Sequence, residues 1–375
     1  MSKTVKLLRE LIALPSVNPA FLPAGHPYAG EQRVAEFLAA TAAQAGLEIA
    51  FQPVLPGRAN LLARLSPGGN PRQRVVLAPH LDTVNGAPEQ FTPRSKNGRI
   101  YGRGACDTKG SVAAMLGALR EVARGARRPK ETEIVFAALI DEENAQAGSR
   151  ALAGSRLQAG LAIVGEATRL QVVTAHKGSI WLRLETRGKA AHGAQPELGR
   201  NAVHAMARVV ELLETDYAAQ LRKRRHPLLG PATVSVGVIC GGTQPNIVPD
   251  RCEIQFDRRT LPGETEASVG REVLSLLSRH GLRASFVSSK LAPCLPLETD
   301  PRSPLVAGFL RSAGQAKPAG ARYFCDASVL ARGGIPSVVF GPGDIAQAHT
   351  ADEWIAAASL ERAQAMLVRF LTSLP

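Results

Sequence analysis

Three apolar runs that end in acidic residues or histidine constrain the fold of this chain more than any other feature. They are "RVVLAPHLDTV", "ETEIVFAALIDEEN" and "LAIVGEAT", and each is bounded by turn-forming residues, as buried strands are. Strand, polar residue and helix recur three times in this part of the sequence. The alternation predicts an α/β fold with a mostly parallel sheet and helices on both of its faces.

Polar side chains at the exits of these runs are candidates for an active site, because α/β enzymes place their sites there. The first run delivers His80 and Asp82, the second ends in the acids of "DEE" at 141–143, and Glu166 follows the third. The stretch "GRGACDTKG" lies between the first two and sets Asp107 among glycines, just before a helical pattern. A carboxylate in so tight a loop suits a metal ligand better than a surface charge.

The pattern changes at Gly178, where strand, helix, strand, strand, helix and strand follow in order up to residue 288. This order predicts an inserted α+β domain with an antiparallel sheet. We therefore expect a catalytic domain in two parts, 1–177 and 289–375, with the insertion at 178–288. Two domains also suit 375 residues, which exceed the efficient size of one core. Helices are expected over 5–14, 31–45, 111–123, 201–213, 264–280 and 303–315 and from 356 onward, and strands over 48–54, 60–65, 131–140 and 161–164.

The formal charge of +13 raises the question of a nucleic-acid partner. Basic residues are scattered, however, and the one dense run, from Arg222 to His226, fits a solvated helix end better. We expect no nucleic-acid partner, and a small anionic substrate is compatible with the charge. The cysteines number five, without a pairing framework, and no run approaches the roughly 18 apolar residues that span a bilayer. We expect a cytoplasmic protein with no membrane partner.

Taken singly, each polar cluster has a structural explanation. His80 and Asp82 suit a hydrogen-bonded pair, "DEE" and Glu166 suit helix N-termini, and His349 in "QAHTADEW" suits an ordinary loop. Together, two histidines and several carboxylates on one predicted sheet form the ligand set of a divalent metal, especially zinc. The surplus of carboxylates suggests two ions, about 3.5–4 Å apart, that share a bridging carboxylate and a water. One acid then remains unligated to act as a base.

Five ordered motifs, "HLDTV", "GRGACDTKG", "DEE", "GEAT" and "HTADEW", resemble those of the M20 metallopeptidase family. This family includes acetylornithine deacetylases, succinyl-diaminopimelate desuccinylases, aminoacylases and carboxypeptidases, and the resemblance covers the whole chain. It implies a zinc-exopeptidase-like catalytic domain and an inserted ferredoxin-like domain that serves as a lid and forms a homodimer.

The resemblance also implies roles for individual residues. Two zinc ions per subunit, which cobalt can replace, would bind with Asp107 as the bridge. The implied ligands are His80, Asp107 and Glu166 for one ion and Asp107, Glu143 and His349 for the other. Asp82 would orient His80, and Glu142 would be the general base that activates a metal-bridged water for attack on an amide carbonyl.

The inserted domain carries further motifs of the family. "KAAHGAQPELGRNAV" implies that His192 stabilises the oxyanion across a dimer interface, and "GGTQPNIVPDRCEIQFDRRTLPGE" implies substrate contacts from Asn246 and Arg259. Arg259 would clamp a substrate carboxylate, and the alternative for this residue is a strand-end ion pair with Asp257 or Glu264.

The substrate expected from the resemblance is a small N-acyl amino acid. The first activity expected is that of an acetylornithine deacetylase, and the alternative within the family is a metallo-carboxypeptidase or dipeptidase. A non-catalytic binding protein on the same fold is the alternative from another class. Departures from the family pattern leave the acyl group and side chain open. They are Pro79, Ala167, Gly193 and Ala194. Cys106 suggests the acetylornithine deacetylase branch or a packed small residue, and Cys325 is expected to be structural.

Overall fold

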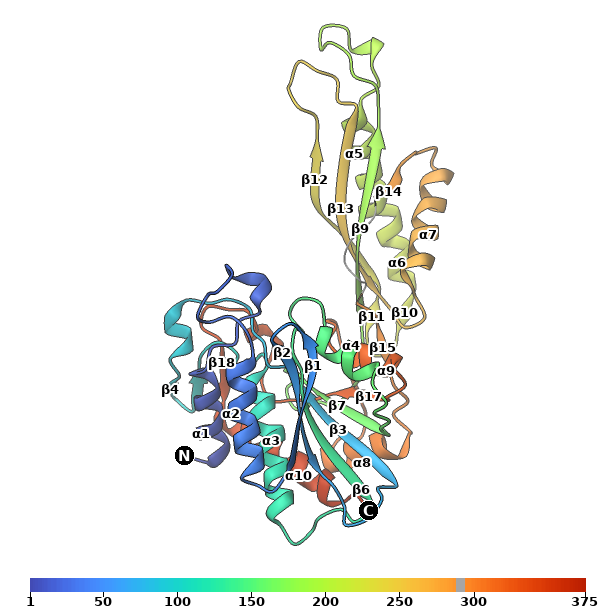
Figure 1. Cartoon of the computed structure of the whole chain (residues 1–375). Helices are drawn as coiled ribbons and strands as arrows, with labels where there is room; N and C mark the ends of the chain where they lie inside the picture. The colour runs from blue at the N-terminus through green and yellow to red at the C-terminus, as the bar shows by residue number, and fades with distance from the viewer. Residues whose placement is uncertain (288–293) are drawn as a thin grey trace. The chain divides into compact units, whose positions relative to one another are not determined.

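The computed structural model describes residues 1–287 and 294–375, which form two compact units. The first unit comprises Met1–Thr174, Thr299–Ala319 and Cys325–Pro375, and the second comprises Ala175–Glu298 and Gly320–Phe324. Figure 1 labels their helices and strands. The expected domain boundary between residues 288 and 289 lies outside the described residues.

A mixed sheet in the order β1-β2-β6-β3-β7-β17-β8 forms the centre of the first unit. The pairs β6–β3, β3–β7 and β7–β17 are parallel, whereas β1–β2, β2–β6 and β17–β8 are antiparallel. The predicted α/β fold is confirmed, with its parallel strands at the middle of the sheet. The strands are β1 Glu48–Leu55, β2 Arg58–Leu65, β3 Gln73–Pro79, β6 Thr132–Ala138, β7 Leu161–Gly165, β17 Ser337–Val339 and β8 Val173–His176. The last two residues of β8 belong to the second unit, as does the short β15 Leu297–Glu298 that pairs with them, and β16 Ala319–Ala321 also pairs with β8.

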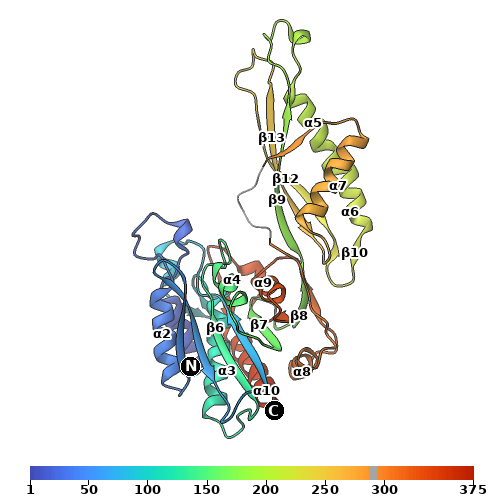
Figure 2. The same cartoon turned by 45° about the vertical axis from the view of Figure 1, so that its right-hand side comes forward.

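Helices cover both faces of this sheet (Figures 1 and 2). One face carries α1 Lys3–Ile12, α2 Gln32–Ala43, α3 Lys109–Arg124, α8 Pro304–Ser312 and α10 Ala357–Thr372, and the other carries α4 Ala147–Ala153 and α9 Ala327–Arg332. Every residue of β6 is buried, as expected of a central strand covered on both sides. The main core joins Leu8, Leu116, Phe136 and Leu367 from four of these elements. Burying a side chain of this size contributes about 1.5–3 kcal/mol.

A second, small sheet of the first unit was not predicted. It has the order β18-β5-β4, with β4 Arg94–Lys96, β5 Arg99–Tyr101 and β18 Trp354–Ala356. The ladder pairs Trp354 with Tyr101 and Ile355 with Ile100, so it joins segments from opposite ends of the sequence. Its strands lead directly into the loops that carry Asp107 and His349.

The second unit is a four-stranded antiparallel sheet in the order β12-β13-β9-β14 with helices packed on one face. The element order confirms the predicted ferredoxin-like fold. It runs β9 Gly178–Arg187, α5 Ala202–Leu212, β12 Thr233–Gly241, β13 Arg251–Thr260, α7 Glu266–Arg279 and β14 Ser285–Val287. The helix predicted to end at residue 213 continues through a π-helical turn at Leu213–Tyr217 into α6 Ala218–Lys223, and a short hairpin, β10 Arg225–His226 and β11 Gly230–Pro231, follows. The 3-10 turns of the two units are Pro19–Phe21, Pro88–Phe91, Pro196–Leu198 and Ile345–Gln347.

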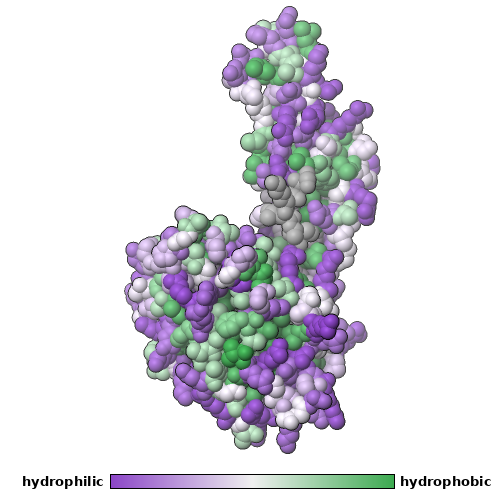
Figure 3. Space-filling model, viewed as in Figure 1, coloured by the Kyte–Doolittle hydropathy of each residue, from purple (hydrophilic) through white to green (hydrophobic). Residues whose placement is uncertain are grey.

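The basic run lies at a solvated helix end, as predicted. Arg222 and Lys223 form the exposed last turn of α6. On the face that Figure 3 shows, hydrophilic residues are spread over each unit and mixed with apolar ones. Among the described helices, none has the length and apolar character needed to cross a membrane.

Candidate metal centre

The parallel strands bring three of the predicted ligand segments to one edge of the sheet. His80 follows β3, Glu142 and Glu143 follow β6, and Glu166 follows β7. Because β6, β3 and β7 are parallel neighbours, their carboxyl ends meet at the same edge. One further parallel bridge, between His80 and Leu139, follows the β3–β6 ladder, so the backbone of His80 is held in the plane of the sheet.

Asp107 reaches this edge from the glycine-rich loop before α3 and faces both histidines. Its Oδ1 lies 3.1 Å from Nε2 of His80, and its Oδ2 lies 3.3 Å from Nε2 of His349. The second imidazole also lies 3.2 Å from Oε2 of Glu143. Gly104 adopts a φ of 81°, a left-handed conformation that glycine tolerates best, so the predicted tight folding of this loop is confirmed.

The tautomer of His80 follows from its hydrogen bonds. The ring is 2% exposed, and Nδ1 lies 3.0 Å from the backbone carbonyl of Asp82, to which it donates. In the neutral form of the ring the proton stays on Nδ1, so a cation that displaced the proton of Nε2 would meet a lone pair there; Nε2 faces Asp107 and lies 3.7 Å from Oε1 of Glu166. Burial lowers the pKa of His80, but hydrogen bonds to Asp107 and Asp82 and the charges of nearby glutamates raise it well above the ordinary value.

Several carboxylates of the site are buried close to one another, so their negative charges repel. Burial raises the pKa of Glu166 well above its ordinary value, and the charges of Asp107 and Glu143 raise it further. Burial and the charge of Asp107 raise the pKa of Glu143 to about 7. Burial raises the pKa of Asp107, but hydrogen bonds with His349 and His80 overcome this and lower it. Such a donor set fits a divalent cation, which would compensate the acids and replace protons on the histidines.

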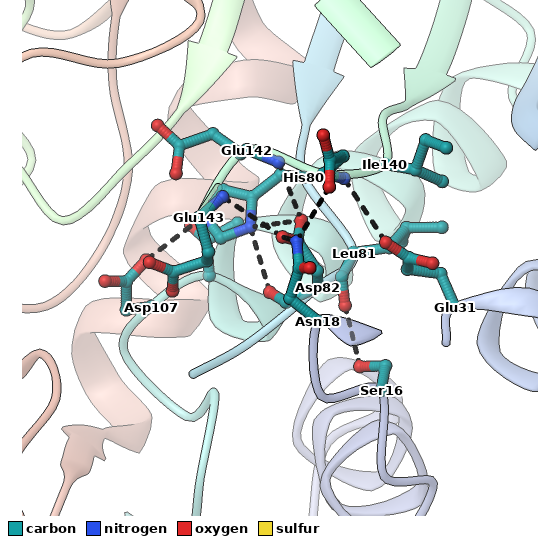
Figure 4. Close-up of polar contacts among 12 residues, drawn as sticks. Ser16, Asn18, Glu31, His80, Leu81, Asp82, Asp107, Ile140, Glu142 and Glu143 are labelled. Carbon is teal, nitrogen blue, oxygen red and sulfur yellow. Dashed lines mark hydrogen bonds and ion pairs between the residues drawn. The ribbon is translucent and has the colours of Figure 1, made fainter. Parts of the chain in front are cut away.

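The carboxylate of Asp82 positions the backbone of the acidic segment. It accepts hydrogen bonds from the backbone N–H groups of Glu142 and Glu143, both at 3.0 Å, and from Nδ2 of Asn18 at 2.8 Å (Figure 4). Its Oδ1 also lies 3.5 Å from Nδ1 of His80. Asp82 thus contacts the first histidine and fixes the two glutamates that follow β6.

A buried ion-pair network supports Asp141, the first acid of "DEE". Arg58 donates to both oxygens of Glu31, at 2.9 and 2.5 Å, and to Oδ1 of Asp141 at 3.1 Å. Asn18 also donates to Asp141, at 3.0 Å, and Asp141 has a φ of 67°, which is costly for a residue with a side chain. Sequence reasoning missed Asn18, Glu31 and Arg58, because single polar residues in loops and at strand ends carry no local signal of such a network.

The carboxylate of Glu142 forms neither a hydrogen bond nor an ion pair with any described residue, whereas that of Glu166 lies 3.7 Å from Nε2 of His80. Figure 4 shows Glu142 beside the site with only its backbone nitrogen engaged. Burial raises its pKa well above the ordinary value, although the charge of His80 opposes this. Among the residues that the structure describes, potential ligand atoms within 4.8 Å of one another form two groups, His80 with Asp107 and Glu143, and His80 with Glu142 and Glu166. Glu142 therefore lies within reach of the centre.

The cysteines near the site do not supply a nucleophile. Cys106 and Cys325 are both buried, and burial raises the pKa of each thiol above its ordinary value. Neither thiol is a thiolate at neutral pH, which agrees with the structural role expected for Cys325.

His192 and Asn246 lie side by side in the second unit. Gly193 donates its N–H to the carbonyl of Asn246 at 2.7 Å, and Val248 donates to the carbonyl of Ala191 at 2.9 Å. Nδ1 of His192 accepts from the backbone N–H of Ala194 at 3.1 Å. The proton of the neutral, exposed ring is therefore on Nε2, which is available as a hydrogen-bond donor.

Arg259 lies on β13 of the same unit and makes one of the ion pairs considered from the sequence. Its Nε donates to Oδ2 of Asp257 at 2.7 Å, and its guanidinium carbon lies 5.8 Å from the ring centroid of Phe324. Glu264, the other candidate partner, pairs instead with Arg258, at 2.6 Å. About a third of the Arg259 side chain remains exposed.

Comparisons with known proteins place the chain in a family. The model of Peptidase family M20/M25/M40 matches residues 76–373. An acetylornithine deacetylase from Myxococcus xanthus is 32% identical over 321 residues, which cover 83% of each chain. The structure of aminopeptidase PepT from Bacillus cereus has a TM-score of 0.79 at 23% identity and covers 99% of this chain and 97% of its own.

A further solved structure has the same fold. Bacillus subtilis YXEP protein, described as a dinuclear metal binding peptidase from the M20 family, has a TM-score of 0.71 at 15% identity and covers 99% of this chain and 97% of its own. The family match spans most of the sequence and includes every segment that carries a predicted metal ligand. The chain therefore belongs to peptidase family M20/M25/M40 and is a hydrolytic enzyme.

Proposed function

We propose that this protein is a dinuclear zinc hydrolase that cleaves the amide bond of a small N-acyl amino acid, as an acetylornithine deacetylase does. One observation carries the proposal: each oxygen of the Asp107 carboxylate faces a different histidine, at 3.1 and 3.3 Å. A carboxylate so placed suits two cations that share it as a bridge. The relatives named acetylornithine deacetylase support the substrate class.

The donor groups divide into two sets around Asp107. One ion would be held by His80 and Glu166 with Oδ1 of the bridge, and the other by Glu143 and His349 with Oδ2. Nitrogen and carboxylate oxygen donors of this kind suit zinc. Co²⁺, which accepts similar ligands, would substitute.

Glu142 has the position and freedom of a general base. When bound, zinc polarises an amide carbonyl and lowers the pKa of water towards neutrality. The unpaired carboxylate of Glu142 would take the proton of the attacking water and pass it to the departing amine, so that one residue serves as base and then as acid. Asp82 would keep this carboxylate in place through the backbone N–H of Glu142.

The second unit would supply the groups that recognise the substrate. His192 would donate from Nε2 to the developing oxyanion of a partner subunit in a homodimer, and Asn246 would contact the substrate beside it. Arg259 would clamp the substrate carboxylate with the N–H groups that its pair with Asp257 leaves free. No disulfide joins the cysteines of the described residues, which suits the cytoplasmic location that we propose.

A hydrolysis screen with and without a chelator tests this function. N-acetyl, N-succinyl and N-carbamoyl amino acids and dipeptides are the substrates, and turnover of an N-acyl amino acid that a chelator abolishes and zinc restores is expected. Turnover of dipeptides alone would favour the metallo-carboxypeptidase or dipeptidase alternative, and metal binding without turnover would favour a binding protein. Activity that survives complete removal of metal would refute the two-metal mechanism.

Glu142→Gln provides the matching variant. The carboxamide keeps the shape of the side chain but cannot accept a proton, so we expect two bound metal ions and a loss of kcat of at least about 100-fold. Metal content is measured by elemental analysis on the same preparation. Substantial turnover by a fully metallated variant would show that another residue is the base.

A further inference from the structure

The carboxylate of Glu353 binds the loop that carries the bridging Asp107. Its Oε1 accepts from the backbone N–H groups of Cys106, at 2.7 Å, and Asp107, at 2.9 Å. Its Oε2 accepts from the N–H of Gly104 and from Nη1 of Arg103, both at 2.9 Å. The side chain has no exposed surface, so all of these bonds form away from solvent. Glu353 lies within the motif "HTADEW", four residues after His349.

The chemistry of this contact requires a carboxylate. Each of the two oxygens accepts two hydrogen bonds from different donors, so all four available donors are satisfied. A carboxamide of the same shape has only one oxygen, and its NH₂ group would face two N–H donors without an acceptor between them. A buried donor left unsatisfied in this way is costly.

The same segment holds His349, the ligand that faces the other oxygen of Asp107. The backbone carbonyl of Glu353 accepts from the N–H of Gly102 at 3.0 Å, at the point where the β5–β18 ladder ends. Gln90 contacts both loops: its side chain donates to the carbonyls of Thr350 and Ala351, at 3.2 and 2.8 Å, and its backbone carbonyl accepts from the N–H of Arg103 at 2.8 Å. The loop of Asp107 and the loop of His349 are therefore tied together from both sides, although they are far apart in the sequence.

We propose that Glu353 is a positioning residue of the metal centre. It holds the backbone of the loop from residue 103 to residue 107 so that Asp107 presents one oxygen to each cation, and it couples this loop to the one that carries His349. The inference rests on the proposed dinuclear centre. It predicts that the loop is already ordered before any metal binds, because the hydrogen bonds to Glu353 involve no metal.

The first test is amide hydrogen exchange in the metal-free protein. In Glu353→Gln, one pair of donors should lose its acceptor while the other keeps it: either the backbone amides of Cys106 and Asp107, or the backbone amide of Gly104 and Nη1 of Arg103, in which case the amide of Gly104 is the reporter. A hydrogen bond to a charged group is worth enough that we expect exchange of the affected amides to accelerate by about 10–100-fold. Asp352→Asn is the matched control, since it removes the same charge from the exposed neighbouring residue and should change neither pair.

The second test is metal titration of the same proteins by calorimetry. We expect Glu353→Gln to weaken binding of Zn²⁺ by about 10–100-fold, the usual effect of changing a group that orients a metal ligand. Asp352→Asn should bind as the wild type does. If Glu353→Gln does not fold, Glu353→Asp keeps the charge and both oxygens but withdraws them by one methylene, and it should show the same two effects in weaker form.

The outcomes separate the inference from the proposed function. Unchanged exchange in the loop, or faster exchange with unchanged zinc affinity, would overturn the positioning role. A wild type that binds no Zn²⁺ would instead refute the dinuclear centre, and the inference would fall with it. Faster exchange together with weaker zinc binding, absent from Asp352→Asn, is the result expected.

Discussion

Replacing Arg58 with methionine should strongly lower the free energy of unfolding of the first unit, because this one side chain compensates two buried carboxylates. The guanidinium lies between Glu31 and Asp141, whose side chains are 1% and 2% exposed. Without it, Glu31 keeps one hydrogen bond, from the N–H of Asp141 at 3.2 Å, and Asp141 keeps the one from Asn18. Breaking a buried pair from one side costs about 3–5 kcal/mol, because uncompensated charge remains buried. Methionine fills most of the vacated volume, so a cavity adds little.

The loss should depend on pH with a definite sign. Burial already raises the pKa of Glu31, and the hydrogen bond from Arg58 opposes that rise. In Arg58→Met the folded-state pKa of Glu31 rises further above its unfolded value, so the variant loses stability as the pH rises through this interval. The difference in unfolding free energy between wild type and variant should be larger at pH 8 than at pH 5.

Urea denaturation measures this difference. Fluorescence of Trp354 reports the first unit when Trp181, which lies in the second unit, is replaced by phenylalanine in all proteins compared. Arg72→Met is the control, since Arg72 is 78% exposed and its pair with Glu131, at 3.1 Å, should contribute only about 0–1 kcal/mol. Equal losses in the two variants, or a loss for Arg58→Met that does not grow with pH, would refute the reasoning.

Two further predictions concern the metal centre and the substrate. Asp107→Asn should weaken binding of both zinc ions in a calorimetric titration, by about 100-fold or more, because it removes a charge and one oxygen that the two sites share. His349→Ala should weaken binding of chiefly one ion. If both variants weakened the two binding steps equally, the bridge would be another residue. Arg259→Ala should raise KM at least about tenfold for substrates with a free carboxylate and little for their amides. Arg183→Ala is the control: it removes an arginine paired with Glu253 on the same sheet and should leave both KM values unchanged. A similar rise in KM for both kinds of substrate in Arg259→Ala would exclude a carboxylate clamp.

The positions of the candidate ligands at strand ends could be predicted because they depend on local pattern. An apolar run followed by His80 or by Glu166 is read from neighbouring residues, and parallel strands necessarily bring such ends together. The geometry around Asp82 could not be read in this way. Its spacing of two from His80 predicts contact with the imidazole, but its carboxylate also holds the backbone of Glu142 and Glu143, about sixty residues further on.

The inserted unit also combines features that the sequence predicts with one that it does not. Its strand and helix order was predictable from periodicity, and the ferredoxin-like sheet follows from it. The sequence left two partners open for Arg259, Asp257 and Glu264. In the structure Asp257 and Arg259 lie two residues apart on β13 and share one face of the sheet, whereas Arg258 between them takes Glu264.

By itself, the sequence determined the α/β class, the inserted α+β fold and the family, and it supplied the candidate metal ligands, because these depend on periodicity and on motifs a few residues long. Only the tertiary structure decided which atoms meet. The two oxygens of Asp107 divide between two histidines, and Glu353 holds the loop of Asp107 across a separation of 246 residues. Such contacts depend on strand order and long-range packing, which bring together groups whose own surroundings in the sequence give no sign of each other.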